Sequence, residues 1–243
     1  MRVLTPTDML SLWEQGDHLH AIDRAIRVLA SVLPERNVDD LMHLPLGPRD
    51  SLLLAVRRAC FGDRMDASDV CPSCGEQVET ELSCNVLAEA GSTPPQEWLL
   101  EHDKYRVTLR PLSSVDAAIA AQCPDVEAAR TALLACSIVT AERDGKRVPA
   151  DQLPAEVASS VAGSLEQHDS GAELLLKLNC PECGHAWCNV LDVASFVWTE
   201  IAARARRLLL GVHTLARAYG WREADILTMS EARRAAYLSM VNA

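Results

Sequence analysis

Two five-residue stretches of the chain share one pattern of cysteine, proline and glycine. CPSCG begins at Cys71 and CPECG begins at Cys180, with 105 residues between Cys74 and Cys180. Each Cys-X-X-Cys turn presents two thiolates from one tight bend, and the following glycine lets the backbone turn so that its amides point towards the sulfurs. Zinc in an all-cysteine structural site takes four thiolates in a tetrahedron. The sequence therefore predicts one structural Zn²⁺ site, with the ligands Cys71, Cys74, Cys180 and Cys183.

The order Cys-Pro-X-Cys also resembles the active-site turn of glutaredoxin-like redox proteins. In those proteins the turn precedes the N-terminus of a helix, whose dipole lowers the thiol pKa. Here a strand-like stretch follows each turn, and the turn occurs twice, so metal binding is favoured over redox chemistry. Haem attachment is excluded because His185 lies one residue beyond the C-x-x-C-H spacing, and we expect it to be exposed or beside the ligands. Four thiolates also suit iron.

Nine cysteines, an odd number, do not fit a secreted disulfide scaffold. The first residues, MRVLTPTDML, lack the apolar run of a signal peptide, and no stretch reaches the ~18 apolar residues of a transmembrane helix. We therefore expect a cytoplasmic location in the producing cell and no membrane insertion. Five cysteines are expected to be small core residues, and the last of them, which lies nearest a turn, is the substitute metal ligand: Cys60, Cys84, Cys123, Cys136 and Cys188.

The motif content argues against enzymatic chemistry. The sequence has no Walker A loop, no G-x-S-x-G elbow, no H-E-x-x-H and no G-x-G-x-x-G motif. A metal held by four cysteines keeps no position open for water, so it would be structural and not catalytic. We expect no enzyme activity and no small-molecule substrate.

Many zinc ribbons bind nucleic acid, through basic and aromatic residues on the strands beside the cysteines. The stretch after the first turn, EQVETELS, is instead acidic, and the one after the second, HAWCNVLD, has one large aromatic residue, Trp187. A zinc-ribbon regulator that binds nucleic acid is therefore the less favoured alternative.

The net charge of −11 is unevenly distributed. Seven arginines and three carboxylates give residues 201–243 a charge of +4, which leaves −15 for residues 1–200. An acidic body does not attract a phosphate backbone, but a basic end can dock an acidic partner. The alternative interpretation is a solvated helix face. If the end does dock a partner, four arginines are the expected exposed contact: Arg204, Arg207, Arg233 and Arg234.

Hydrophobic spacing predicts an α+β fold that is mostly helical. Short helices are expected in the first third, and period-two alternation predicts short strands at 77–83, 104–112, 173–178 and 186–191. Each cysteine turn thus adjoins strands, as in a small antiparallel zinc ribbon. The longest expected helix spans 193–219, followed by two short helices that can fold back on it. Packing within the chain is therefore expected for its apolar face, and packing against a partner helix is the alternative. Its apolar residues form a heptad seam: Trp198, Ile201, Ala205, Leu208, Val212, Leu215 and Tyr219.

The expected organisation has four parts. They are an N-terminal helical region at 1–66, a split zinc ribbon at 67–90 and 172–192, an inserted strand and helical segment at 91–171, and a C-terminal helical region at 193–243. The insertion is expected to hold a loop, a strand, a helix broken near Cys123-Pro124, an exposed excursion and a second helix, in that order at 91–96, 104–112, 116–140, 142–154 and 156–168.

Several stretches resemble T-even-type phage baseplate hub assembly proteins and their relatives in contractile injection systems. The paired CPxCG turns have the same places in members of that family. The other matching stretches lie at both ends of the chain: Leu12-Trp13-Glu14, Arg24-Ala25, residues 46–50, Phe61-Gly62, Leu191-Asp192, residues 196–200, residues 212–216, Tyr219-Gly220-Trp221 with Glu223, Ile226-Leu227, Ser230, Arg233-Arg234 and Tyr237-Leu238.

This resemblance implies a role in building or completing the baseplate of a phage tail or contractile injection system, as a structural component or as an assembly chaperone. It implies baseplate hub or spike proteins as partners, and the assembled particle or virion as a second location. Distant relatives lack the cysteines, which implies that zinc is a local stabiliser.

Overall fold

The computed structural model describes residues 1–90 and 94–241. Helices dominate, and the strands of the described residues form three antiparallel sheets, so the expected α+β class is confirmed. The chain forms two compact units, Met1–Glu35 with Ala194–Ala243, and Arg36–Val193. Residues 36–66, which the sequence analysis grouped with the N-terminal helices, belong to the second unit; the four-part division stays a prediction. No helix among the described residues is both long and apolar enough to cross a membrane.

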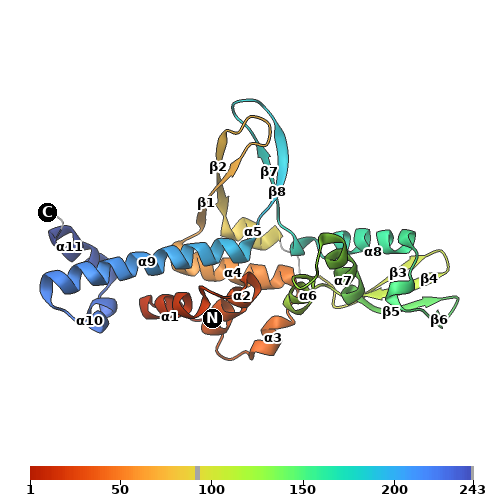
Figure 1. Ribbon diagram of the computed structural model, residues 1–243, viewed down its shortest axis with the longest axis horizontal. Coiled ribbons are helices and arrows are strands. Elements are labelled where there is room, and N and C mark those ends of the chain that lie inside the picture. The colour runs from red at the N-terminus through yellow and green to blue at the C-terminus, as the bar shows by residue number, and fades with distance from the viewer. Residues whose placement is uncertain (91–93, 242–243) are drawn as a thin grey trace. The chain divides into compact units, whose positions relative to one another are not determined.

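The first unit joins the two ends of the chain. It contains α1 (Pro6–Gly16), α2 (Ala21–Val32), α9 (Val193–Tyr219), α10 (Glu223–Thr228) and α11 (Glu231–Val241), and Figure 1 shows α1 beside α9. Thr5 caps α1 by accepting a hydrogen bond from the N–H of Asp8. Gly16 lies against Trp198 of α9 so closely that an added Cβ would stand 2.3 Å from the indole Cη2.

Helix α9 covers the predicted residues, and its heptad seam is its buried face. Six of the seven seam residues are less than 9% exposed, and Tyr219 at the end is 41% exposed. Tyr219 stacks on Trp221 with ring centroids 4.5 Å apart and meets the edge of Tyr237 at 5.9 Å. The seam therefore packs within the chain, as expected.

The second unit begins with α3 (Val38–Met42) and α4 (Leu46–Phe61) and contains α5 (Cys84–Ala90) after the first pair of strands. Asn37 caps α3, and Gly62 ends α4 with φ +93°. The unit also contains α6 (Ser114–Ala120), α7 (Val126–Ser137), α8 (Ala155–His168) and the short 3₁₀ turns η1 (Ala150–Gln152) and η2 (Ser170–Ala172). The break near Cys123-Pro124 separates α6 from α7, as predicted.

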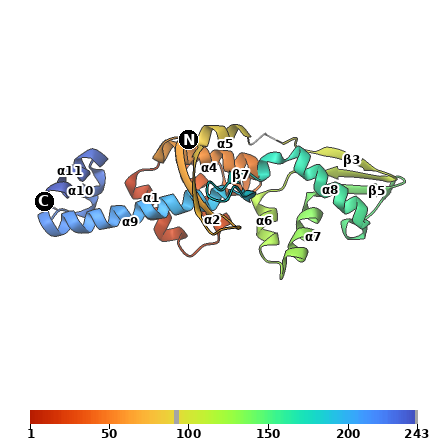
Figure 2. The same cartoon turned by 90° about the horizontal axis from the view of Figure 1, so that it is seen from above.

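The inserted segment holds more strand than its sequence predicts. Strands β3 (Trp98–His102), β4 (Tyr105–Leu109), β5 (Ile138–Arg143) and β6 (Lys146–Arg147) form a sheet in that order. Figure 2 shows α8 along this sheet, and the two share a core that includes Trp98, Val107 and Val161. The predicted helix over 116–140 is wrong at its end, because three β-branched residues, 138–140, continue as β5 and pair with β4. Of the predicted loop at 91–96, residues 91–93 lie outside the described residues.

Candidate metal centre

Each cysteine turn closes an antiparallel hairpin. β1 (Arg64–Val70) pairs with β2 (Gln77–Ser83), and β7 (Leu175–Asn179) pairs with β8 (Ala186–Val190). Figure 1 shows the two hairpins side by side with their turns at the same end. The sequence predicts three of these strands and misses β1, because only Met65 of RMDASDV is buried and the strand has no clear apolar alternation.

The two turns have the same backbone geometry. In the first, the N–H of Gly75 donates to the carbonyl of Cys71 at 2.9 Å, and in the second the N–H of Gly184 donates to the carbonyl of Cys180 at 3.0 Å. Both glycines have positive φ, +77° and +72°, which a residue with a Cβ adopts only with strain. The repeated CPxCG pattern therefore encodes a repeated turn.

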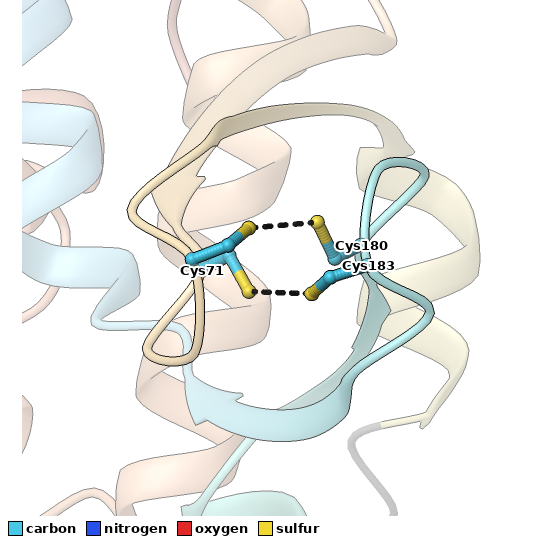
Figure 3. Close-up of side chains that lie close together, drawn as sticks. Cys71, Cys180 and Cys183 are labelled. Carbon is cyan, nitrogen blue, oxygen red and sulfur yellow. Dashed lines mark hydrogen bonds between the residues drawn. The ribbon is translucent and has the colours of Figure 1, made fainter.

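The four cysteine sulfurs lie within 4.8 Å of one another. Across the hairpins, Cys71 Sγ is 3.7 Å from Cys183 Sγ, and Cys74 Sγ is 3.6 Å from Cys180 Sγ. Figure 3 shows the two turns face to face, with the labelled side chains pointing towards one another. A tetrahedral site with Zn–S bonds of about 2.3 Å has S···S edges of about 3.8 Å. Both distances fit that edge, and both are too long for a disulfide bond.

The cluster is half buried. Cys71 and Cys180 are each 1% exposed and pack with Val78 and Trp187, whereas Cys74 and Cys183 are exposed. The two buried sulfurs are thus fixed by apolar contacts, and the two exposed sulfurs lie on the solvent side of the site.

The pKa values of the two exposed thiols, Cys74 and Cys183, are shifted in opposite directions. A hydrogen bond from the N–H of His185 is the main cause that lowers the pKa of Cys183 to about 7. The N–H of Glu76 also donates to Cys74, but the other three sulfurs and desolvation outweigh it and raise the pKa of Cys74 to about 12. Each turn therefore directs one backbone amide at its exposed sulfur.

A hydrogen-bonded link outside the cysteines joins the two hairpins. Asp69 of β1 accepts from Trp187 Nε1 at 3.0 Å and from Asn189 Nδ2 at 2.8 Å, both on β8. These bonds, the one from Trp187 first, lower the pKa of Asp69. Sequence reasoning missed this link. The i, i+2 spacing places Trp187 and Asn189 on one face of β8, but no pattern points to a partner more than 100 residues away.

The remaining cysteines lie outside the cluster. Cys84 is buried, as expected of a core residue, and three others are half buried: Cys60, Cys123 and Cys136. Cys188 is exposed, which corrects its expected place in the core, because the two-stranded hairpin leaves this face uncovered. The side chain of His185 is exposed and stacks on Trp187 at 6.1 Å, and its backbone carbonyl accepts from the N–H of Cys180.

The structure brings three of the four predicted arginines together. Arg204 and Arg207 of α9 and Arg234 of α11 line one pocket, while Arg233 is exposed and lies over the ring of Tyr237 at 5.8 Å. Arg234 is 5% exposed, so the expectation of an exposed side chain is wrong there, because α11 packs that residue against α9. Their contact with a partner stays a prediction.

Comparison with known protein families shows which family the chain belongs to. Residues 8–198 match the family model described as T4 bacteriophage base plate protein. The chain belongs to this family. The match includes the similar stretches near the N-terminus and both cysteine turns, and it ends at Trp198, so the similar stretches in residues 199–238 lie beyond it. Searches of the curated proteins and of the solved structures found no match.

Proposed function

We propose that this phage baseplate family member is a non-enzymatic structural or assembly protein, chaperone-like in the second case, of a phage tail or contractile injection system. The observation that carries the proposal is the family match over residues 8–198. Two hairpins that expose most of their residues, in a chain whose long helix already buries its own seam, suit a protein that contacts other proteins. The partners we propose are hub or spike proteins of the baseplate.

We further propose that the four-cysteine cluster binds a structural zinc ion. The support is the pair of 3.6 and 3.7 Å sulfur separations, which fit a tetrahedron of thiolates. Bound there, zinc would cross-link two hairpins that lie more than 100 residues apart in the chain. The ligands Cys71, Cys74, Cys180 and Cys183 leave no position for a substrate water, so the ion would stabilise and not catalyse.

The alternative of a nucleic-acid-binding zinc ribbon gains no support from the hairpin surface. The concave face of β1 and β2 carries three carboxylates and one arginine, and negative charge repels a phosphate backbone. The residues on this face are Arg64, Asp66, Ala67, Ser68, Glu79, Thr80 and Glu81.

The experiment that tests the proposed role is quantitative mass spectrometry of purified contractile particles from the producing cell, alongside the soluble fraction of the same lysate. Stoichiometric presence in particles identifies a structural component. Presence only in soluble complexes with hub precursors identifies an assembly chaperone. Absence from both contradicts the baseplate role. A strain that lacks the gene provides the background control for both fractions.

A further inference from the structure

A small basic pocket lies between α9 and α11 in the first unit. Its volume is 140 Å³, and Figure 1 shows α11 folded back beside α9. Three arginines and one glutamate line it together with three apolar residues: Arg204, Arg207, Leu208, Glu231, Arg234, Ala235 and Leu238. The lining thus carries three positive charges and one negative charge.

The single carboxylate does not balance this pocket. Glu231 pairs with Arg204, whose Nη2 lies 2.6 Å from its Oε2. Among the described residues, neither Arg207 nor Arg234 has an ion-pair partner. The hydrogen bond from Arg204 is the first cause that lowers the pKa of Glu231, and the charges of Arg234 and Arg207 lower it further. All three guanidinium groups therefore lie close enough to affect the carboxylate of Glu231. The charges of the pocket lining sum to +2.

Among the three arginines, Arg234 gives the strongest indication of a binding role, because its charge is buried. It is 5% exposed, and the hydrogen bond from its guanidinium to the carbonyl of Met229 is 3.5 Å long. Burial and the neighbouring Arg204 lower its pKa. A buried guanidinium without a close counter-ion destabilises a fold unless another group neutralises it. A residue needed only for packing would be better served by an apolar side chain.

We propose that Arg204, Arg207 and Arg234 form a binding site for an acidic side chain of a protein partner. A carboxylate accepts paired hydrogen bonds from a guanidinium, and the site already holds one carboxylate, that of Glu231. The walls formed by Leu208, Ala235 and Leu238 suit the aliphatic residues that flank a glutamate in a peptide. The inference does not depend on the baseplate role, because the pocket chemistry is the same for any acidic partner.

The test uses the full-length protein and two capped tripeptides, Leu-Glu-Leu and Leu-Gln-Leu, followed through the arginine Nε–Hε signals in NMR titrations. We expect the glutamate peptide to shift the signals of Arg207 and Arg234 saturably, and the glutamine peptide to bind at least about tenfold more weakly, since charge-assisted hydrogen bonds are the stronger ones. Equal responses to both peptides overturn the proposal. So does tighter binding of inorganic phosphate than of the glutamate peptide.

Adjacent arginines provide matched variants. Arg207→Gln should weaken glutamate-peptide binding about tenfold, whereas Arg206→Gln, also exposed on α9 but outside the pocket, should change it less than about twofold. Arg234→Met should weaken binding by a similar factor without lowering the melting temperature, because it removes a buried charge. Equal losses for the two α9 variants, or a lower melting temperature with unchanged binding for Arg234→Met, contradict the inference. Self-association that Arg207→Gln abolishes, without any response to the peptide, would assign the pocket to a second copy instead.

Discussion

At the scale of single residues, the cysteines differ in position more than in chemistry. Cys183 and Cys188 are both exposed and both belong to the second hairpin, yet only Cys183 lies in the cluster. Two cysteines with identical side-chain chemistry therefore differ in whether they can contribute to the proposed metal site.

We expect Cys183→Ser to abolish stoichiometric metal binding and Cys188→Ser to leave one ion per chain, because only the first removes one of four thiolates. Inductively coupled plasma mass spectrometry of protein purified without added metal measures the content and identifies zinc or iron. Metal retained in the Cys183 variant would exclude the four-cysteine site, and metal lost in the Cys188 variant would make that residue a ligand.

A second residue-scale feature is the buried carboxylate of Asp169, after α8. It is 5% exposed, and its Oδ1 has no hydrogen-bond partner among the residues that the structure describes. Burial raises its pKa to about 6 despite a hydrogen bond from the backbone of Leu112. The pKa is about 3.9 in an unfolded chain, so the folded state binds the proton more tightly. Stability therefore falls as pH rises from about 4 to 6, and the penalty persists above that window.

Asp169→Asn should remove this penalty. We expect the variant to exceed the parent's free energy of unfolding by about 1–2 kcal/mol at pH 7, and the difference to shrink towards pH 4.5. Urea denaturation at both pH values measures it. Asp151→Asn, at an exposed position in η1, is the control and should change stability by less than about 0.5 kcal/mol. A difference that does not vary with pH would refute the titration argument.

At the scale of elements, the hairpins and the larger sheet differ in what holds them. β1–β2 and β7–β8 are isolated two-stranded pairs, which are marginal in water without further support. β3 to β6 form a four-stranded sheet with its own apolar core under α8. A metal cross-link should therefore matter to the hairpins and not to the sheet.

Removal of the metal with a chelator under reducing conditions should expose the hairpins to solvent exchange. We expect amide exchange in β1, β2, β7 and β8 to accelerate by at least about 100-fold, because a structural zinc site contributes folding free energy directly. Amides of β4 are the internal control and should keep their protection. Hydrogen–deuterium exchange mass spectrometry measures both; unchanged hairpins would mean that the Asp69 link and apolar contacts suffice without the ion.

The helices and strands also show how much of the fold can be predicted from the sequence. Helix α9 and strand β2 were predictable to the residue, because a heptad seam and a clean alternation are strong local signals. Strand β1 was not predictable, because it is defined by its pairing with β2 and its own sequence has no clear alternation. The clustering of the four cysteines was predictable from the repeated CPxCG turn and thiolate chemistry. The Asp69 link and the burial of Arg234 depend on which elements pack together, and no local pattern encodes that.

At the scale of the whole molecule, the two units divide the chain's features between them. The four cysteines of the cluster belong to the unit Arg36–Val193. The α9 seam and the arginine pocket belong to the unit that contains both ends of the chain. The first unit forms only when residues 1–35 pack against α9, although residues 36–193 separate them in the sequence. The contact between Gly16 and Trp198 is part of that packing.

Two helical glycines test this division. An alanine Cβ at Gly16 would meet the Trp198 ring, which is 6% exposed and lies under the guanidinium of Arg24, so the ring has little room to move. Gly16→Ala should destabilise the first unit by about 1–3 kcal/mol and leave the metal content at one ion per chain. An alanine Cβ at Gly163 of α8 meets no described atom within 4 Å, so Gly163→Ala should stabilise by up to about 1 kcal/mol. Calorimetry with metal analysis of both variants measures these effects. Loss of the ion in the Gly16 variant would show that the cysteine site depends on the closure of the chain ends, and the two units would then have to be treated as one folding unit.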